Sequence, residues 1–115
     1  MATSRSVRLS DAPGDMQPVS VKGVDIDPAR RRVRVEGREV VLTDQEFRLL
    51  HLVATHAGIV FGRDELLAKI WRGDTFVTVR SVDTLVKRLR RRIEPNPAEP
   101  RFLLTVWGVG YKFTD

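Results

Sequence analysis

The segment from Val79 to Ile93 constrains the fold more than any other part of the sequence. Its apolar residues recur at spacings of four, three and four, as on one face of an α-helix: Val82, Val86, Leu89 and Ile93. At about 100° per residue, a set of polar and basic residues falls on the other side: Arg80, Thr84, Lys87, Arg88 and Arg91. Because such a stripe must be buried, we expect this helix to pack on a domain with its basic face outward.

The net charge of the chain is concentrated in the same helix. The sequence has 115 residues, with 20 Lys and Arg against 15 Asp and Glu, for a net charge of +5. Six of the basic residues and only one acid, Asp83, lie between Arg80 and Ile93, so the rest of the chain is balanced. This concentration favours a partner lined by phosphates, because release of condensed counterions drives binding. A solvated helix face is the alternative, although like charges one turn apart repel by roughly a few tenths of a kcal/mol each.

Length and composition exclude several classes of protein. A chain of 115 residues fits one domain. The absence of cysteine excludes a disulfide scaffold and thiolate metal sites, and it is compatible with a reducing cytosol. No apolar run approaches the ~20 residues of a membrane span, and the start lacks the apolar core of a secretory signal. Residues 1–18 are polar and contain Pro13, Gly14 and Pro18, so we expect a disordered tail or linker before a domain over 19–115.

Short strands are expected at both ends of this domain. Val21, Val24 and Ile26 predict one strand, and Val33 and Val35 a second. A hairpin turn at 36–38 leads to a third strand over 40–42, which makes a small antiparallel sheet. Near the C-terminus, 101–106 and 109–113 alternate as two strands around Trp107-Gly108, a hairpin that follows the basic helix as a wing would.

Two further helices are expected between the sheet and the basic helix. Thr43 and Glu46 fit a capping box, with apolar residues at helical spacing behind them and Gly58 as a stop. A second helix is expected over 63–72, followed by a loop over 72–78. Pro95 and Pro97 end the basic helix. The expected fold class is therefore α+β, a winged helix-turn-helix with three helices between an N-terminal antiparallel sheet and a C-terminal hairpin.

The sequence resembles the C-terminal effector domain of OmpR/PhoB-type response regulators over nearly all of 19–114. The resemblance rests on several motifs in order: Leu42-Thr43 with Glu46-Phe47, Arg63-Asp64-Glu65-Leu66-Leu67 through Trp71, Arg80-Ser81-Val82-Asp83 leading to Arg88-Leu89-Arg90, Pro100-Arg101-Phe102, and Thr105-Val106 through Gly108-Val109-Gly110-Tyr111. Each motif alone is weak, but their order and spacing together are strong. The resemblance implies a four-stranded N-terminal sheet and a transcription regulator that acts in the bacterial cytoplasm on the nucleoid.

The resemblance also implies a role for particular residues. The helix over 79–93 would enter the major groove of double-stranded DNA, and the wing over 101–114 would lie at the adjacent backbone or minor groove. Base-facing side chains are expected at three positions: Thr84, Leu85 and Arg88. Contacts with the sugar–phosphate backbone are expected at eight: Arg63, Trp71, Arg80, Ser81, Lys87, Arg90, Arg91 and Thr105. The wing residues are Trp107, Tyr111 and Lys112. The loop expected to contact RNA polymerase contains Arg72, Asp74, Thr75 and Phe76.

Assembly and domain content are further implications of the resemblance. Members of the family commonly bind direct repeats as head-to-tail dimers. Many carry arginine at the position of Trp107 and probe the minor groove with it, a contact this chain cannot make. The family's receiver domain needs roughly 100 residues or more, which residues 1–18 cannot hold. The chain is therefore either a fragment of a longer regulator or a stand-alone regulator without a receiver.

Other functional classes have weaker support in the sequence. His51 and His56 are five apart and do not share a helix face as metal ligands would. Asp25 and Asp27 share a strand face without a nearby third ligand or general acid. We therefore expect no metal, no cofactor, no membrane contact and no enzymatic activity. RNA binding, and a protein-interaction module that contacts RNA polymerase instead of DNA, stay as alternatives, although aromatics on the C-terminal strands match a base-stacking sheet poorly.

Overall fold

Four short antiparallel strands form the N-terminal sheet of the computed structural model, which describes residues 16–72, 74 and 76–115. Their order in the sheet follows the chain, and their bounds are β1 Val19–Val21, β2 Val24–Asp27, β3 Arg32–Val35 and β4 Arg38–Val40. The single strand expected through Val21 and Ile26 is wrong, because the chain reverses at Lys22 and Gly23. Both have positive φ, 52° and 86°, as a tight hairpin turn requires. The hairpin turn expected at 36–38 is present, with Glu36 and Gly37 at φ of 51° and 82°.

One face of this sheet is apolar and the other is charged. The strand register places Val24 opposite Val35 and Ile26 opposite Val33. Five valine and isoleucine side chains on the inner face are buried: Val24, Ile26, Val33, Val35 and Val40. The expected third strand over 40–42 is displaced, since β4 ends at Val40 and Val41 is 81% exposed. The chain leaves the sheet there to enter the first helix.

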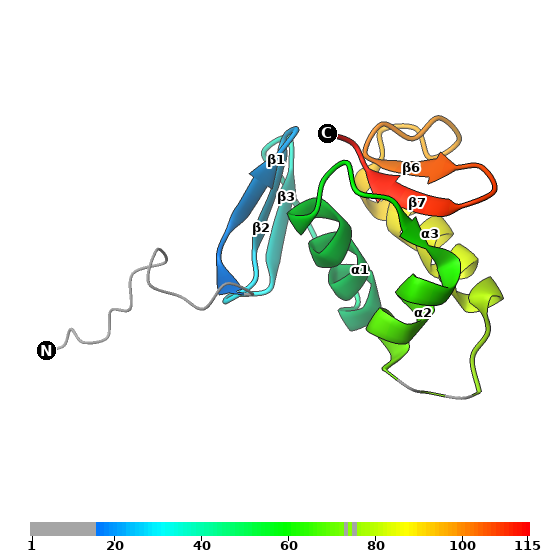
Figure 1. Ribbon diagram of the computed structural model, residues 1–115. Helices are drawn as coiled ribbons and strands as arrows, with labels where there is room; N and C mark the ends of the chain where they lie inside the picture. The colour runs from blue at the N-terminus through cyan, green and yellow to red at the C-terminus, as the bar shows by residue number, and fades with distance from the viewer. Residues whose placement is uncertain (1–15, 73, 75) are drawn as a thin grey trace, which may run out of the picture.

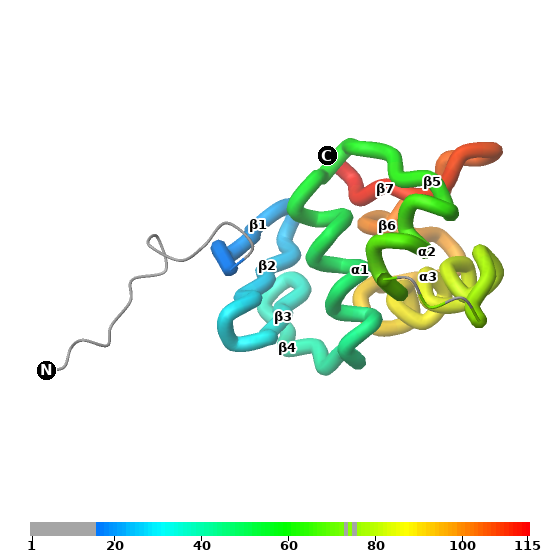
Figure 2. The backbone as a smooth tube through the Cα atoms, turned by 60° about the horizontal axis from the view of Figure 1, so that its bottom comes forward, coloured from blue at the N-terminus to red at the C-terminus, as the bar shows by residue number. Residues whose placement is uncertain are grey.

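Helix α1, Asp44–Thr55, is the central element of the fold. The expected capping box is confirmed: the Glu46 backbone N–H donates to Thr43 Oγ1 at 3.2 Å, and the Thr43 N–H donates to Glu46 Oε1 at 2.9 Å. Its buried side chains include Phe47, Leu50 and Val53, at the helical spacing expected. Figures 1 and 2 both show α1 beside the N-terminal sheet on one flank and the remaining helices on the other.

Helices α2 and α3 complete the helical layer. α2 spans Arg63–Trp71, one residue shorter than expected, because Arg72 is left-handed and ends it. α3 spans Val79–Ile93, as expected. None of the described helices is long and apolar enough to cross a membrane.

The second sheet consists of the wing hairpin and a two-residue strand. β7, Gly110–Phe113, lies between β5, Phe61–Gly62, and β6, Leu103–Val106. The buried rings of Phe102, just before β6, and Phe113, in β7, stack with centroids 6.2 Å apart. The turn between β6 and β7 projects from the body of the domain, orange to red in Figures 1 and 2. The fold class expected from the sequence is confirmed.

Gly110 permits the closest backbone approach in this sheet. A Cβ at Gly110 would lie 2.0 Å from the Phe61 carbonyl oxygen and 2.9 Å from its carbonyl carbon. These are backbone atoms, so β5 and β7 would have to separate. A Cβ at Gly62, on the paired residue of β5, would meet nothing closer than 3.9 Å.

We therefore predict that Gly110→Ala destabilises the domain by about 3 kcal/mol or more, because the clash separates the wing from β5. Gly62→Ala is the matched control and should cost less than about 1 kcal/mol, mostly through the helix N-cap. Urea unfolding followed by circular dichroism measures both. Equal and small effects of the two substitutions would contradict the tight approach at Gly110.

Candidate nucleic-acid interface

The outer face of α3 is cationic and exposed. The expected apolar stripe is confirmed, since Val82, Val86, Leu89 and Ile93 are each no more than 1% exposed. Opposite the stripe, four basic side chains are exposed and, within the described residues, form no ion pair with a carboxylate: Arg80, Lys87, Arg88 and Arg91. This face can therefore offer its charge to an anionic partner.

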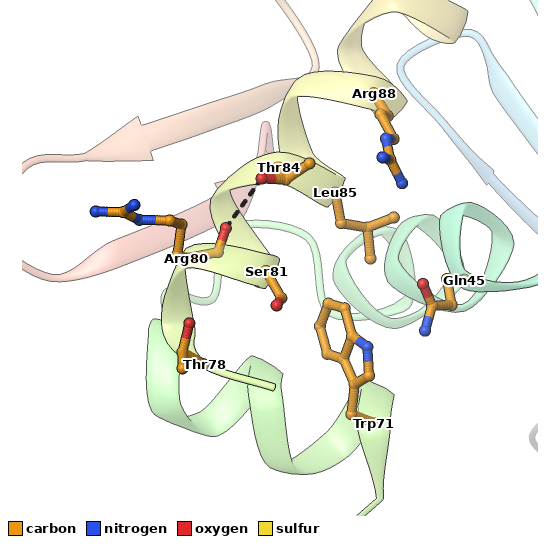
Figure 3. Close-up of a pocket in the computed structure, with 8 residues that line it drawn as sticks. All are labelled: Gln45, Trp71, Thr78, Arg80, Ser81, Thr84, Leu85 and Arg88. Atoms are coloured by element: carbon orange, nitrogen blue, oxygen red, sulfur yellow. Dashed lines mark hydrogen bonds between the residues drawn. The ribbon is translucent and has the colours of Figure 1, made fainter. Parts of the chain in front are cut away.

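A shallow hollow runs beside this face, between α3 and the ends of α1 and α2. It is lined by eight residues: Gln45, Trp71, Thr78, Arg80, Ser81, Thr84, Leu85 and Arg88. In Figure 3, Trp71 points up from α2 toward α3, and the Thr84 hydroxyl donates to the Arg80 carbonyl oxygen, 3.1 Å away. The expected backbone contacts Trp71, Arg80 and Ser81 therefore lie on the same concave surface as Thr84 and Arg88.

Leu85 differs from the expectation that it faces a base. Its side chain is only 3% exposed. The helical angle places it between the apolar stripe and the outer face, where Gln45 of α1 and Trp71 of α2 border it (Figure 3). Leu85 therefore contributes to the core of the domain, and the exposed positions at the centre of the face are Thr84 and Arg88.

Asp83 joins three elements at the base of the wing. Arg63, at the start of α2, donates to it through Nε at 3.1 Å and through Nη2 at 2.5 Å. The Tyr111 hydroxyl of β7 donates to Asp83 Oδ1 at 2.7 Å. The one acid in the basic helix therefore fixes the wing and α2 relative to α3. Arg63, expected on the DNA backbone, is half-exposed and already holds this carboxylate.

The network shifts the ionisation of its members. Burial raises the pKa of Asp83, but hydrogen bonds from Tyr111 and Arg63 outweigh burial, so the pKa lies below its ordinary value. Burial, together with the hydrogen bond to Asp83, raises the pKa of Tyr111 to about 12. The hydrogen bond to Asp83 raises the pKa of Arg63. At neutral pH the network therefore contains a charged pair and a neutral phenol.

A hydrogen bond between Arg90 of α3 and Thr105 of β6 joins the helix to the wing. Arg90 donates through Nε to the Leu103 carbonyl oxygen at 3.0 Å and through Nη2 to Thr105 Oγ1 at 2.8 Å. Its guanidinium also lies 5.6 Å from the centroid of the Tyr111 ring, and partial burial lowers its pKa. Both residues were expected to contact the DNA backbone. The position of Arg90 on the wing side of α3 instead directs it inward, so the pair anchors the wing.

Glu94 holds the start of the wing, a structural role that the sequence did not indicate. Its side chain is 5% exposed and accepts from the backbone N–H groups of Arg101, Phe102 and Leu103 at 2.6–3.1 Å. A buried carboxylate needs such donors, and these would otherwise be unpaired at the start of the wing. The sequence shows only an acid before Pro95, and nothing local reveals its partners.

The tip of the wing is apolar and exposed. Trp107 is 89% exposed and Val109 is 56% exposed, so the tryptophan does not pack back onto the domain. A groove separates this tip from the starts of α2 and α3, where Arg63 and Asp83 line it. Lys112 is partly buried on β7. The expected wing residues are therefore spread along the hairpin, with Trp107 at its tip and Tyr111 at its base.

Most of the described residues of the loop between α2 and α3 are exposed. Phe76 is 96% exposed, and its N–H donates to Asp74 Oδ1 at 2.9 Å. Arg72 is also exposed, whereas Thr75, the fourth residue expected to contact polymerase, lies outside the described residues. Phe76 therefore has no role in the core.

The acids and histidines weighed as metal ligands are dispersed. Asp25 accepts from Ser20 Oγ at 2.6 Å, and Asp27 pairs with Arg30 at 3.1 Å. His51 stacks on Phe47, and His56 lies against Phe61. Across residues 16–72, 74 and 76–115, no three of the potential ligand residues are grouped to hold a metal ion.

The chain is similar to a known protein family and to several solved structures. Residues 37–113 match the family described as "Transcriptional regulatory protein, C terminal". The response regulator DrrB of Thermotoga maritima, an OmpR/PhoB homologue, is 38% identical with a TM-score of 0.78. That match covers 85% of this chain and 44% of DrrB, so this chain spans less than half the length of that protein.

Two isolated domains are similar over most of their length. The DNA-binding domain of RstA from Klebsiella pneumoniae, solved in complex with the RstA box, is 37% identical with a TM-score of 0.75. The match covers 84% of this chain and 96% of that domain. The DNA-binding domain of CpxR from E. coli is 25% identical, with a TM-score of 0.71 and coverage of 90% and 98%.

The Asp83 network yields a test by titration. Tyr111 is the only tyrosine in the chain, so tyrosinate absorbance reports it alone. We predict a titration midpoint of about 12 in the folded domain. Asp83→Asn should lower the midpoint toward the ordinary value, because it removes the charge that opposes ionisation of the phenol. Circular dichroism at each pH is the control for folding, and an ordinary midpoint in the folded wild type would refute the contact.

Proposed function

Because this chain belongs to the family of OmpR/PhoB-type response-regulator DNA-binding domains, we propose that it binds double-stranded DNA sequence-specifically and regulates transcription as an effector domain. The observation that carries the proposal is the outer face of α3, where Arg80, Lys87, Arg88 and Arg91 are exposed and form no ion pair with any carboxylate of residues 16–72, 74 and 76–115. The opposite face of α3 is packed in the core, so the helix is already formed and fixed in place before a partner binds. We assign no enzymatic step to this function.

The proposed binding mode places α3 in the major groove. A helix about 10–12 Å across matches a groove about 12 Å wide. Thr84 and Arg88 lie at the centre of the exposed face and are proposed to reach base edges. Arginine suits guanine, whose O6 and N7 accept a bidentate pair of hydrogen bonds. Leu85 supports these two side chains from the core.

Contacts with the sugar–phosphate backbone are proposed around this centre. Four exposed or partly exposed residues of α3 are proposed to contact it directly: Arg80, Ser81, Lys87 and Arg91. Trp71 lines the same hollow and offers its indole N–H. Arg63 keeps an exposed edge beyond its bonds with Asp83, so we propose that it adds a phosphate contact. Arg90 and Thr105 act indirectly, by holding the wing.

The wing is proposed to lie along the adjacent backbone or minor groove. Trp107 offers an apolar ring and one donor, which suit packing on a sugar, while Lys112 supplies charge. Tyr111 positions the hairpin through Asp83.

Further partners follow from the family. We propose that two copies bind direct-repeat half-sites head to tail, and that the loop with Arg72, Asp74 and Phe76 contacts RNA polymerase. Such a regulator would act on the bacterial nucleoid in the cytoplasm.

The first prediction from the proposed function separates base reading from backbone contact. Arg88→Ala should cost about 1–3 kcal/mol on the preferred site and flatten preference at one base position, because a bidentate contact is lost. Arg80→Ala is the matched control and should weaken all duplexes alike. Selection of bound sites from random duplexes, followed by titration, measures both effects. Equal losses on specific and random DNA for Arg88→Ala would show that Arg88 does not read a base.

The second prediction concerns the wing tip. Trp107→Arg should strengthen DNA binding and steepen its salt dependence by up to about one unit of slope, because the added cation meets a phosphate or a narrow minor groove. Trp107→Ala should weaken binding modestly and leave the melting temperature unchanged, since the indole is 89% exposed. A sharp fall in melting temperature with unchanged DNA affinity would instead make the indole a core residue.

The third prediction concerns the loop. Substitution of Asp74 and Phe76 together by alanine should spare DNA affinity and reduce transcription in a reconstituted assay, because both lie outside the face of α3. The DNA-binding titration is the control. Transcription equal to the wild type would argue against a polymerase contact through this loop.

A further inference from the structure

A groove between α1 and α2 lies apart from the surface assigned to DNA. On the α1 side it is bounded by residues from Arg48, in the second turn, to the C-cap His56, and on the α2 side by Lys69, Ile70 and the C-cap Arg72. The groove shares no residue with the hollows beside α3 and the wing. Both views of the whole chain show α1 and α2 side by side (Figures 1 and 2). DNA bound on α3 would therefore leave this groove accessible.

The groove combines an apolar floor with a basic rim. Ile70 is buried, and the partly buried Leu52 packs against the core beside it. Lys69 and Arg72 are exposed on the α2 side and, within the described part of the chain, form no ion pair. Among the residues that the structure describes, no carboxylate lines the groove. Arg48 is already engaged, because it pairs with Asp44 at 3.0 Å and donates to the Ile70 carbonyl oxygen at 3.3 Å.

Arg72 occupies a backbone conformation that favours glycine. Its φ and ψ are both 50°, and its N–H donates to the Ala68 carbonyl oxygen at 3.1 Å. Lys22, Arg31 and Glu36 also have positive φ, and of these Arg31 and Glu36 use their side chains in ion pairs, with Asp44 and Arg101 respectively. Arg72 instead presents its cation to solvent at the mouth of the groove.

Local stabilisation explains only part of this arrangement. Cations near a helix C-terminus gain about 0.3–1 kcal/mol from the helix dipole, which accounts for the charges of Lys69 and Arg72. It does not account for the apolar floor between the two helices. A nucleic-acid phosphate would likewise match the cations and leave the floor uncovered.

We propose that this groove docks an acidic, amphipathic peptide segment of a protein partner. An apolar side chain of the segment packs on the partly exposed Leu52, beside the buried Ile70, and its carboxylates pair with Lys69 and Arg72. The complementarity of charge selects an acidic segment, and the floor selects one that also carries leucine-like side chains. The proposal does not depend on DNA binding, since no residue of α3 enters it.

The test uses the full chain labelled with ¹⁵N and a blocked peptide of sequence Glu-Leu-Glu-Glu-Leu-Leu-Glu-Glu. Amide shifts should map to the end of α1 and to Lys69–Arg72. A peptide with Gln for each Glu removes the charge, and an all-Glu peptide removes the apolar side chains. Both should bind the groove about tenfold more weakly or not at all, as expected for loss of exposed ion pairs or of apolar contact.

Two matched variants, each losing two positive charges, locate the binding. Lys69→Gln with Arg72→Gly should weaken peptide binding about tenfold while DNA affinity stays unchanged. Glycine suits the left-handed position, so this variant should fold at least as well as the wild type. Lys87→Gln with Arg91→Gln on α3 should instead weaken DNA binding and change peptide affinity by less than about twofold.

Peptide shifts confined to α3, equal binding of the all-Glu peptide, or binding that only the α3 variant reduces would each overturn the proposal. These outcomes are separate from the outcome of the DNA-binding tests on α3. A chain that fails to bind DNA should still bind the peptide in the groove.

Discussion

Burial of the apolar stripe of α3 stabilises this helix against the repulsion between its own positive charges. Each fully buried Val, Leu or Ile side chain is worth about 1.5–3 kcal/mol, so the four residues of the stripe contribute on the order of 6–12 kcal/mol. Repulsion between cations one turn apart, such as Lys87 and Arg91, costs only roughly a few tenths of a kcal/mol per pair. Packing therefore dominates, and it turns the basic face to solvent, where the proposed function needs it.

The polar contacts of α3 are divided between its two sides. Asp83 and Arg90 lie two helical turns apart on the side of the wing, and Glu94 follows at the end of the helix. Each bonds to the hairpin or its approach, so the wing is fixed at three points along the helix. Arg88 and Arg91 lie on the other side and have no carboxylate partner within the described residues. A rigid frame and an open cationic surface thus share one helix.

The sequence predicted the parts of this design that depend on local spacing. The stripe of α3, the capping box at Thr43 and the wing turn at Gly108 all follow from periodicity or turn chemistry. Contacts between distant segments did not follow, because spacing along the chain does not show which segments meet. Glu94 accepts from N–H groups seven to nine residues away, and Leu85 lines the same hollow as Trp71 of another helix. The sequence predicted a DNA-backbone contact for Arg90. Its position around the helix instead places its side chain beside Thr105 of the wing.

The salt dependence of DNA affinity tests the central claim most directly. If about four or five basic side chains per protomer meet phosphates, the logarithm of the binding constant should fall against the logarithm of salt concentration with a slope near −4 per protomer. Lys87→Gln with Arg91→Gln should reduce the steepness by about two units, since two phosphate contacts are lost. A slope near zero in the wild-type chain would contradict the assignment of α3 as a DNA-binding surface.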